Sequence, residues 1–345
     1  MNNLSRRSLL GFGSAGLGVA GLAALGACAS QKNPSDSATG GSDSSGADSG
    51  DWPRTVTDEQ GEVTIDKQPT KIVSTSPSVT GTLLAIDAPV VASAATSPSP
   101  LTDDKGFFKQ WASVADERGV EVLYSNLEFD LEAVISFDPD LVVVASSGKD
   151  SVADQVETIK QQFPVIVVDY GKQSWQDLAT QLGKALGLED KATAAGTEFD
   201  SYIKEAKGKI TPPEGGASIV SYNGKDKDQA IAKKDSAHAD LLTSLGLEVV
   251  EADASLDSGN RQRNDFMFVS YENLSKAITG ESVFLISTGQ DQVQKFLDDE
   301  TLANLPAVTN NQVYYLGPTS FRIDFYSGKL VADAVVEQLG ASCRA

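Results

Sequence analysis

Short runs of β-branched residues recur along this chain and alternate with segments of helical periodicity. Four such runs fall at residues 71–75, 90–92, 140–145 and 165–169. Their apolar residues are contiguous rather than alternating, which is typical of parallel strands buried on both faces. We therefore predict an α/β lobe with a parallel sheet over residues 53–188.

A helix closes this predicted lobe. Trp175, Leu178, Leu182 and Leu186 follow helical spacing. Ser174 and Asp177 form a capping signature at the start, and Gly187 supplies the stop. The pattern predicts an amphipathic helix over residues 175–186.

The same alternation restarts after two prolines at 212 and 213. Residues 218–221 predict a strand, residues 241–246 the end of a helix, and residues 248–250 a further strand. A second α/β lobe is therefore expected over residues 211–345.

A long amphipathic segment lies between the two predicted lobes, at residues 189–210. Its apolar face consists of Ala192, Ala195, Phe199, Tyr202, Ile203, Ala206 and Ile210. This spacing predicts a helix of about 30 Å. The expected fold is thus two Rossmann-like lobes joined by a single long helix.

The first residues of the chain have the features of an export signal. Arg6 and Arg7 precede an apolar stretch rich in glycine and alanine that ends at Cys28. This resembles a twin-arginine signal with a lipobox, so residues 1–27 would be removed and Cys28 lipidated. A permanent transmembrane anchor is the alternative, but about 17 apolar residues diluted by glycines are short for a span. Residues 28–52 are rich in Ser, Gly and Asp, which predicts a flexible tether.

The charge balance of the chain excludes several classes of function. There are 28 basic and 48 acidic residues, a net charge of −20 that becomes −22 if residues 1–27 are removed. Such a chain is not expected to bind nucleic acid or anionic lipid through its surface. His238 is the one histidine, and Cys28 and Cys343 are the two cysteines. A zinc site built from His and Cys, or a CxxC redox centre, is therefore excluded.

Six segments of the body together resemble one protein family. In chain order they are residues 51–61 (DWPRTVTDEQG), 71–75 (KIVST), 81–90 (GTLLAIDAPV), 106–111 (GFFKQW), 172–176 (KQSWQ) and 321–327 (FRIDFYS). They are similar to the periplasmic binding proteins for iron siderophores, the ferric-enterobactin binders in particular, and the resemblance extends over residues 51–335.

The resemblance implies a fold and a function. The fold would be that of a class III substrate-binding protein, in which a helical backbone joins two lobes and a ferric siderophore lies in the cleft between them. The protein would be a monomeric lipoprotein on the extracytoplasmic face of the membrane. It would deliver its ligand to a dimeric ABC permease with its ATPase, and it would need neither catalytic residues nor a cofactor.

Arginines are the expected ligand contacts. A ferric tris-catecholate carries about three negative charges and exposed rings, which favour guanidinium groups for hydrogen bonding and stacking. Arg261 and Arg263 lie in a polar loop, and Arg322 follows a predicted strand at residues 312–316. The resemblance implies that Arg263 and Arg322 face the ligand. Aromatic candidates are Tyr222 and Tyr124, together with Phe107, Phe108 and Trp111, although aromatic residues at such spacing are more often core.

Some positions depart from the family pattern and leave the ligand open. Ala232 stands where an enterobactin binder has a cleft tryptophan, and the loop around Leu101 lacks an arginine. A catecholate siderophore is favoured, with a haem or another metal chelate as the alternative. His238 could complete the coordination of ferric iron or pair with Met267 on haem, whereas a lone histidine at a helix start is more often a surface or capping residue.

Two further classes of function compete with ligand capture. An enzyme would need a nucleophile elbow, and no G-x-S-x-G motif occurs after residue 27. A structural surface lipoprotein that binds no solute would lack convergent positive groups. We therefore expect a binding protein rather than an enzyme.

Two glutamates occupy matching positions in the predicted lobes. Asp130 is followed two residues later by Glu132, and Ser270 is followed two residues later by Glu272. An acid in the first helical turn is explained by capping electrostatics alone. The resemblance adds a second interpretation, in which each lobe uses one acid to dock on the permease.

Overall fold

The computed structural model describes residues 52–225, 227–259 and 263–340. All of them belong to one compact unit, Ser49–Ala345. Within these residues no helix combines the length and apolar character needed to cross a bilayer. Four residues with predicted roles lie outside the described part of the chain: Arg6, Arg7, Cys28 and Arg261.

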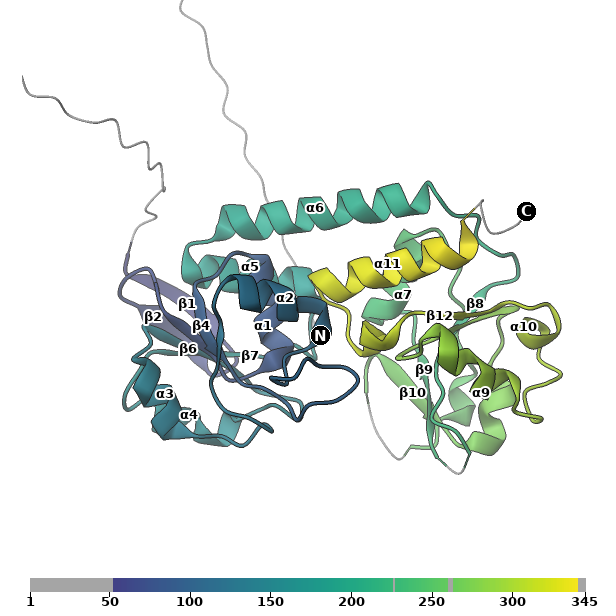
Figure 1. Cartoon of the computed structure of the whole chain (residues 1–345), viewed down its shortest axis with the longest axis horizontal. Coiled ribbons are helices and arrows are strands. Elements are labelled where there is room, and N and C mark those ends of the chain that lie inside the picture. The colour runs from purple at the N-terminus through teal and green to yellow at the C-terminus, as the bar shows by residue number, and fades with distance from the viewer. Residues whose placement is uncertain (1–51, 226, 260–262, 341–345) are drawn as a thin grey trace, which may run out of the picture. The chain divides into compact units, whose positions relative to one another are not determined.

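The first sheet has five strands, all parallel, in the order β5-β4-β3-β6-β7. Figure 1 labels β4, β6 and β7 of this sheet, in the lobe at the left. Its strands are β3 (Ile72–Ser74), β4 (Val90–Ser93), β5 (Glu121–Val122), β6 (Leu141–Ala145) and β7 (Val165–Val168). Every residue of β6 and β7 is buried, as expected of strands covered on both faces. The predicted parallel lobe is confirmed.

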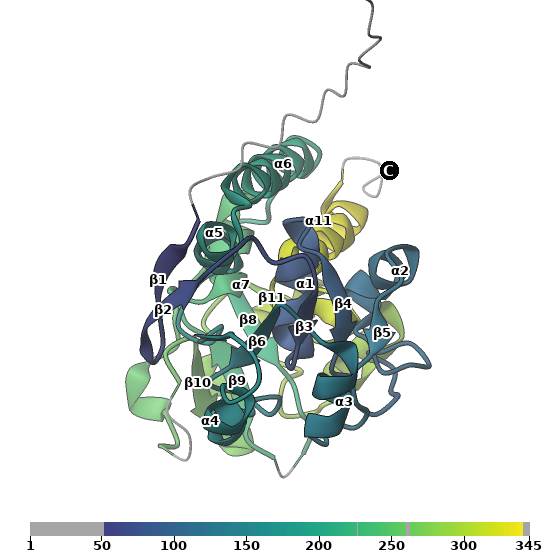
Figure 2. The same cartoon turned by 90° about the vertical axis from the view of Figure 1, so that its left-hand side faces the viewer.

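Helices cover both faces of this sheet. One face packs against α1 (Pro77–Ala85), α2 (Lys109–Glu117) and α5 (Trp175–Leu186). The opposite face packs against α3 (Leu131–Phe137) and α4 (Val156–Ile159). A hairpin of β1 (Arg54–Asp58) and β2 (Gly61–Ile65) lies beside α5 at the edge of the lobe (Figure 2).

The second sheet has the order β10-β9-β8-β11-β12. Its strands are β8 (Ala217–Ser221), β9 (Gln229–Ala232), β10 (Phe266–Val269), β11 (Ser282–Leu285) and β12 (Val313–Tyr315). Strands β8, β11 and β12 are parallel, whereas β9 is antiparallel to both β8 and β10. Only residues 222–228 separate β8 from β9, and a parallel crossover needs a dozen or more. The second lobe is therefore mixed rather than a copy of the first.

One predicted strand is wrong in the second lobe. Residues 248–250 form only an isolated bridge, between Val249 and Ala217. The helical elements of this lobe are α7 (Ala237–Ser244), η2 (Ala254–Leu256), η3 (Tyr271–Asn273), α8 (Leu274–Ala277), η4 (Gln290–Gln292), α9 (Val293–Leu297), α10 (Pro306–Thr309), η5 (Pro318–Phe321) and α11 (Phe325–Leu339). Residues 153–155 of the first lobe form a further short helix, η1 (Ala153–Gln155).

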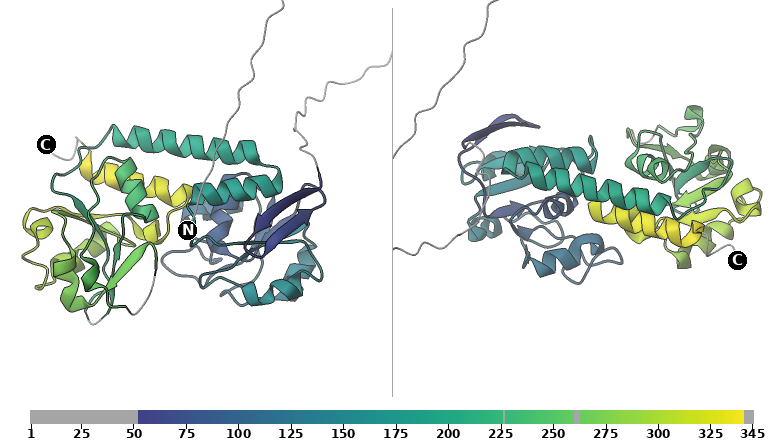
Figure 3. Two further views of the ribbon diagram at one scale, coloured as in Figure 1. Left: turned by 180° about the vertical axis from the view of Figure 1, so that it is seen from behind. Right: turned by 90° about the horizontal axis from the view of Figure 1, so that it is seen from above.

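The chain passes between the sheets through α6 (Glu189–Lys207). It follows α5, where Ser174 accepts a hydrogen bond from the Asp177 amide and Gly187 has a φ of +69°, so the predicted caps are confirmed. Helix α11 lies alongside α6 in both views of Figure 3. The Tyr202 hydroxyl on α6 donates to Asp333 on α11 at 2.6 Å. The expected single connecting helix is thus reinforced by a second one.

Candidate functional site

Arg322 lies where the strand ends of the two lobes meet. It follows η5, directly after β12 of the second sheet. Its Nη2 donates to the carbonyl oxygen of Tyr170 at 3.0 Å, and its Cζ lies 3.9 Å from the centre of the Tyr170 ring. Tyr170 follows β7 of the first sheet. Ligands of open α/β sheets bind at the carboxyl ends of strands, so this contact marks the candidate site.

The guanidinium of Arg322 remains charged in this position. Burial lowers its pKa, while the neighbouring Tyr170, Asp324 and Asp150 raise it. The ordinary pKa of arginine lies so far above neutrality that the group stays protonated. The site therefore keeps a fixed positive charge.

Tyr170 and Asp150 are site residues that the sequence analysis missed. The Tyr170 hydroxyl donates to Asp150 at 2.6 Å, and Asp150 is buried. Tyr170 directly follows the β-branched run at residues 165–169. Its place at the end of a predicted parallel strand is the signal that could have found it.

Arg263 is the second predicted arginine that the structure describes, and it lies near the first. Its charge lowers the pKa of Arg322, and Tyr170 contributes to raising the pKa of Arg263. Its Nε donates to Asp265 at 2.7 Å, and this pairing is the main cause of the raised pKa. The Arg263 side chain is 54% exposed. Arg263 is therefore a second positive charge in the electrostatic environment of Arg322, partly neutralised by Asp265.

The aromatic side chains predicted as ligand contacts all have partners within the protein. Tyr222 follows β8 and is half-buried, with its hydroxyl on Asp299 at 2.6 Å. Tyr124 is only 7% exposed and donates to the Thr75 carbonyl at 3.1 Å, so its ring and hydroxyl are engaged within the first lobe. Phe107 and Trp111 are fully buried, as core residues are.

Phe108 takes part in a second contact between the lobes. Its ring packs edge-on against Phe321 of η5, with centroids 5.0 Å apart. Phe321 immediately precedes Arg322 in the chain. The segment of the second lobe that carries Phe321 and Arg322 therefore contacts the first lobe at two points, Phe108 and Tyr170.

His238 is a buried core residue, so the expected surface or capping role is wrong. It is only 5% exposed, and its Nε2 donates to the carbonyl oxygen of Ser320 at 2.6 Å. The cap of α7 is Ser236, whose hydroxyl accepts from the Ala239 amide. Burial lowers the pKa of His238. Because its Nε2 carries the proton of this hydrogen bond, that nitrogen is not available to iron.

The pairing of His238 with Met267 on one haem is also wrong. Phe266 and Met267 are consecutive residues of β10, and successive side chains of a strand point to opposite faces of the sheet. Phe266 packs against His238 with ring centres 5.4 Å apart, whereas Met267 belongs to the core on the other face. The sheet itself separates the two supposed ligands.

Asp299 gathers hydroxyl groups from three parts of the second lobe. Tyr222 donates to it at 2.6 Å, and Tyr271 and Thr301 each donate at 2.7 Å. Burial raises the pKa of Asp299, but these hydrogen bonds outweigh burial and lower it to about 2. The cluster joins the end of β8 to the short helix η3.

We expect Asp299→Asn to lower the denaturation midpoint at neutral pH. A folded-state pKa below the ordinary 3.8 contributes stability above that pH, and the contribution is lost as the pH falls through about 2. The difference in denaturation midpoint between Asp299→Asn and the parent should therefore shrink between about pH 4 and pH 2. Urea denaturation at several pH values can measure it. Asp298→Asn, at the exposed neighbour, is the control. A difference that does not change with pH would contradict the role of this carboxylate.

The two matching glutamates are both exposed. Glu132 is in the first turn of α3, where Asp130 accepts hydrogen bonds from the Glu132 and Ala133 amides, as predicted. Glu272 is in η3, and within the described chain the Ser270 side chain makes no capping bond, so that prediction is wrong. Helix α3 leads into β6, and η3 with α8 leads into β11. Because β6 and β11 hold the same place in their sheets, the two acids are equivalent in position.

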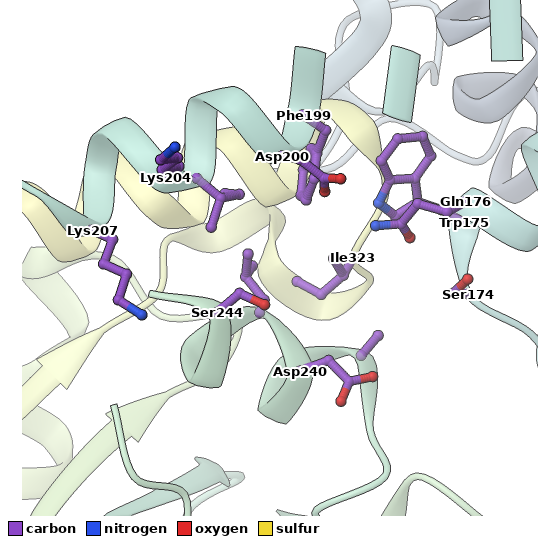
Figure 4. Close-up of a pocket in the computed structure, with 13 residues that line it drawn as sticks. Ser174, Trp175, Gln176, Phe199, Asp200, Lys204, Lys207, Asp240, Ser244 and Ile323 are labelled. Atoms are coloured by element: carbon purple, nitrogen blue, oxygen red, sulfur yellow. The ribbon is translucent and has the colours of Figure 1, made fainter. Parts of the chain in front are cut away.

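A cavity of about 310 Å³ lies between α6, α7 and the start of α5, and Ile323, which directly follows Arg322, also lines it (Figure 4). Trp175, Phe199 and Ile203 contribute to its apolar wall. Among the described residues, none of the predicted ligand contacts lines it. Nowhere in the described part of the chain do three His, Cys, Asp or Glu side chains form a group suited to a metal ion.

Comparisons with known proteins give a consistent result. The family model described as periplasmic binding protein matches residues 72–319. The ferric enterobactin-binding periplasmic protein FepB of Escherichia coli O6:H1 is 39% identical over 286 residues, which are 82% of this chain and 90% of the relative. The Fe(3+)-citrate-binding protein YfmC of Bacillus subtilis is 24% identical over 269 residues, 76% of this chain and 77% of the relative. The crystal structure of holo-ViuP superposes with a TM-score of 0.78 at 42% identity and covers 84% of this chain and 96% of that one.

Proposed function

The chain belongs to the periplasmic binding protein family, and from this premise we propose that it captures a ferric siderophore for an ABC importer. The observation that carries the proposal is the fixed cation of Arg322 at the meeting point of the strand ends. An arginine in this place suits an anionic chelate with exposed rings. No catalytic role is proposed for any residue, and no cofactor is required.

A catecholate is the ligand class that we propose. The FepB relative, named for ferric enterobactin, is 39% identical to this chain, and Arg322 with Arg263 supplies two cations for a trianion. Ala232 is buried in β9 and offers no stacking ring. We therefore propose a ferric tris-catecholate as the ligand class and do not restrict it to enterobactin.

Quenching of tryptophan fluorescence by a panel of ferric siderophores tests this function. Trp111 and Trp175 are both buried within the lobes, so a coloured chelate bound between the lobes should quench them by energy transfer. We expect saturable quenching by ferric tris-catecholates and none by haem at equal concentration. Saturation by haem alone would contradict the siderophore assignment.

The partner proposed for the loaded protein is a dimeric permease with its ATPase. One exposed glutamate on each lobe, Glu132 and Glu272, would contact one half of that dimer. A monomer presents both acids to a single permease, which is the stoichiometry we propose.

A lipid anchor at Cys28 is proposed to hold the protein at the outer face of the membrane. We expect Cys28→Ala to leave the chain unprocessed or to release it from the membrane, because acylation would be lost. Cell fractionation with immunoblotting measures the outcome, and Cys343→Ala is the matched cysteine control. A Cys28→Ala protein that is processed to the size of the parent and still sediments with membranes as firmly would contradict the anchor.

A further inference from the structure

We infer that Asp150, Tyr170 and Arg322 form an interlobe clasp, in which the first lobe orients the ligand-binding guanidinium of the second. Tyr170 is then a positioning residue for Arg322. The inference rests on the proposed function for the identity of the ligand class. The existence of the clasp itself depends only on contacts in the free protein.

Arg322 is anchored through a single residue of the other lobe. Both the ring and the carbonyl oxygen of Tyr170 contact its guanidinium, at 3.9 Å and 3.0 Å. Within the described part of the chain, Arg322 has no ion pair with a carboxylate at hydrogen-bonding distance. A guanidinium has five N–H groups, so most of them stay available to an anionic ligand.

Tyr170 is itself held rigidly. Its hydroxyl donates to Asp150, which also accepts from the Ser76 hydroxyl and, at 3.1 Å, from the Ser78 amide. Burial and then Asp150 raise the pKa of Tyr170 to about 12, so the phenol keeps its proton and donates at neutral pH.

The chain leaves room for this arrangement at Gly148. A Cβ built there would lie 1.7 Å from the Tyr170 hydroxyl oxygen, and the residue has a φ of +94°. Any side chain at this position would displace the tyrosine. Ser76, Asp150 and Tyr170 follow β3, β6 and β7, so three strand ends of the first sheet converge on one arginine of the second.

This arrangement couples the orientation of Arg322 to the spacing of the lobes. An arginine side chain without neighbours samples many rotamers, and each one lost on binding weakens affinity. The clasp fixes the guanidinium before the ligand arrives. Because the anchor belongs to the other lobe, the arginine is correctly placed only while the lobes keep this distance, which the Phe108–Phe321 contact also supports.

A double-mutant cycle in ligand binding tests the clasp. Tyr170→Ala should weaken binding of a ferric tris-catecholate roughly 2- to 30-fold, the range that corresponds to a cation–π contact. In the Arg322→Ala background, Tyr170→Ala should weaken ligand binding less than about twofold, because the partner of Tyr170 is absent. Tyr170→Phe keeps the ring and should therefore lose less ligand affinity than Tyr170→Ala.

Tyr202→Ala is the matched control for this cycle. Tyr202 also donates to an aspartate, and Lys329 lies over its ring at 5.3 Å, but it belongs to the connecting helices. The effect of Tyr202→Ala on ligand affinity should be the same in the parent and in the Arg322→Ala background. Equal losses for Tyr170→Ala in both backgrounds would overturn the clasp, and tighter binding by Tyr170→Ala would show that the ring competes with the ligand instead.

Urea denaturation without ligand separates this inference from the proposed function. It compares the parent, Tyr170→Ala, Arg322→Ala and the Tyr170→Ala/Arg322→Ala double variant. If the clasp exists in the free protein, the midpoint shifts of Tyr170→Ala and Arg322→Ala should sum to more than the shift of the double variant. Additive shifts would overturn the clasp. A parent that binds no ferric catecholate would contradict the proposed function instead, and the denaturation cycle would still decide whether the clasp is present.

Discussion

Arg322→Ala is expected to weaken binding of a ferric tris-catecholate roughly ten- to a hundredfold. A hydrogen bond to a charged group contributes about 1.5–3 kcal/mol, and every 1.4 kcal/mol corresponds to a factor of ten. Arg322 is half-buried at the strand ends, where water screens its charge less than at an open surface. Arg322→Lys should recover only part of the affinity, because the planar fork and the stacking on Tyr170 are lost.

The net charge of the chain does not prevent capture of a trianion. Charges farther away than about 8 Å are screened at physiological ionic strength. The local field at the site therefore depends on Arg322 and Arg263 and on the neighbouring Asp150, Asp265 and Asp324 rather than on the distant surface carboxylates.

Fluorescence titration of the purified Arg322 variants with ferric catecholates measures the expected loss of affinity. Arg118→Ala is the control, because Arg118 pairs with Asp87 on the first lobe and lies outside the site. Unchanged affinity of Arg322→Ala for every ferric catecholate would remove this arginine from the ligand site.

Local features of the sequence predicted the elements well because their causes are local. The helix α5 begins after a Ser174 cap and ends at Gly187, which adopts the left-handed conformation that glycine favours. Contiguous β-branched runs likewise identified the buried strands β6 and β7, because burial on both faces leaves a continuous apolar pattern.

The site was harder to predict because its contacts join distant parts of the chain. Tyr170 and Arg322 are 152 positions apart, and no periodicity links them. His238 was expected at the surface or as a cap because a lone histidine at a helix start more often has that role, yet the Ser320 carbonyl from a distant loop satisfies its ring and allows it to be buried. Tertiary contacts of this kind decide which polar residue is part of a site and which is part of the core.

Reversing the charge of both Glu132 and Glu272 should abolish siderophore uptake while solute binding stays intact. Helices that pack on parallel strands run antiparallel to them, so their first turns lie at the carboxyl edge of the sheets, beside the ligand site. Both acids are exposed there on equivalent elements, and neither has a resolved contact with Arg322 or Tyr170. Two such charges would fix the orientation of the protein on a basic permease without entering the ligand site, and charge pairs of this kind control on-rate and specificity.

Uptake of iron-labelled siderophore in cells that carry Glu132→Lys and Glu272→Lys together measures the effect, and fluorescence titration of the same protein checks ligand binding. Each single variant should retain part of the uptake, because the other lobe can still dock. The control reverses two exposed acids at the opposite edge, Glu117 at the end of α2 and Glu214 ahead of β8. It makes the same change in net charge, so a general electrostatic effect would impair both double variants equally. Normal uptake by the Glu132 and Glu272 double variant would leave these two residues with no role beyond the electrostatics of their helix starts.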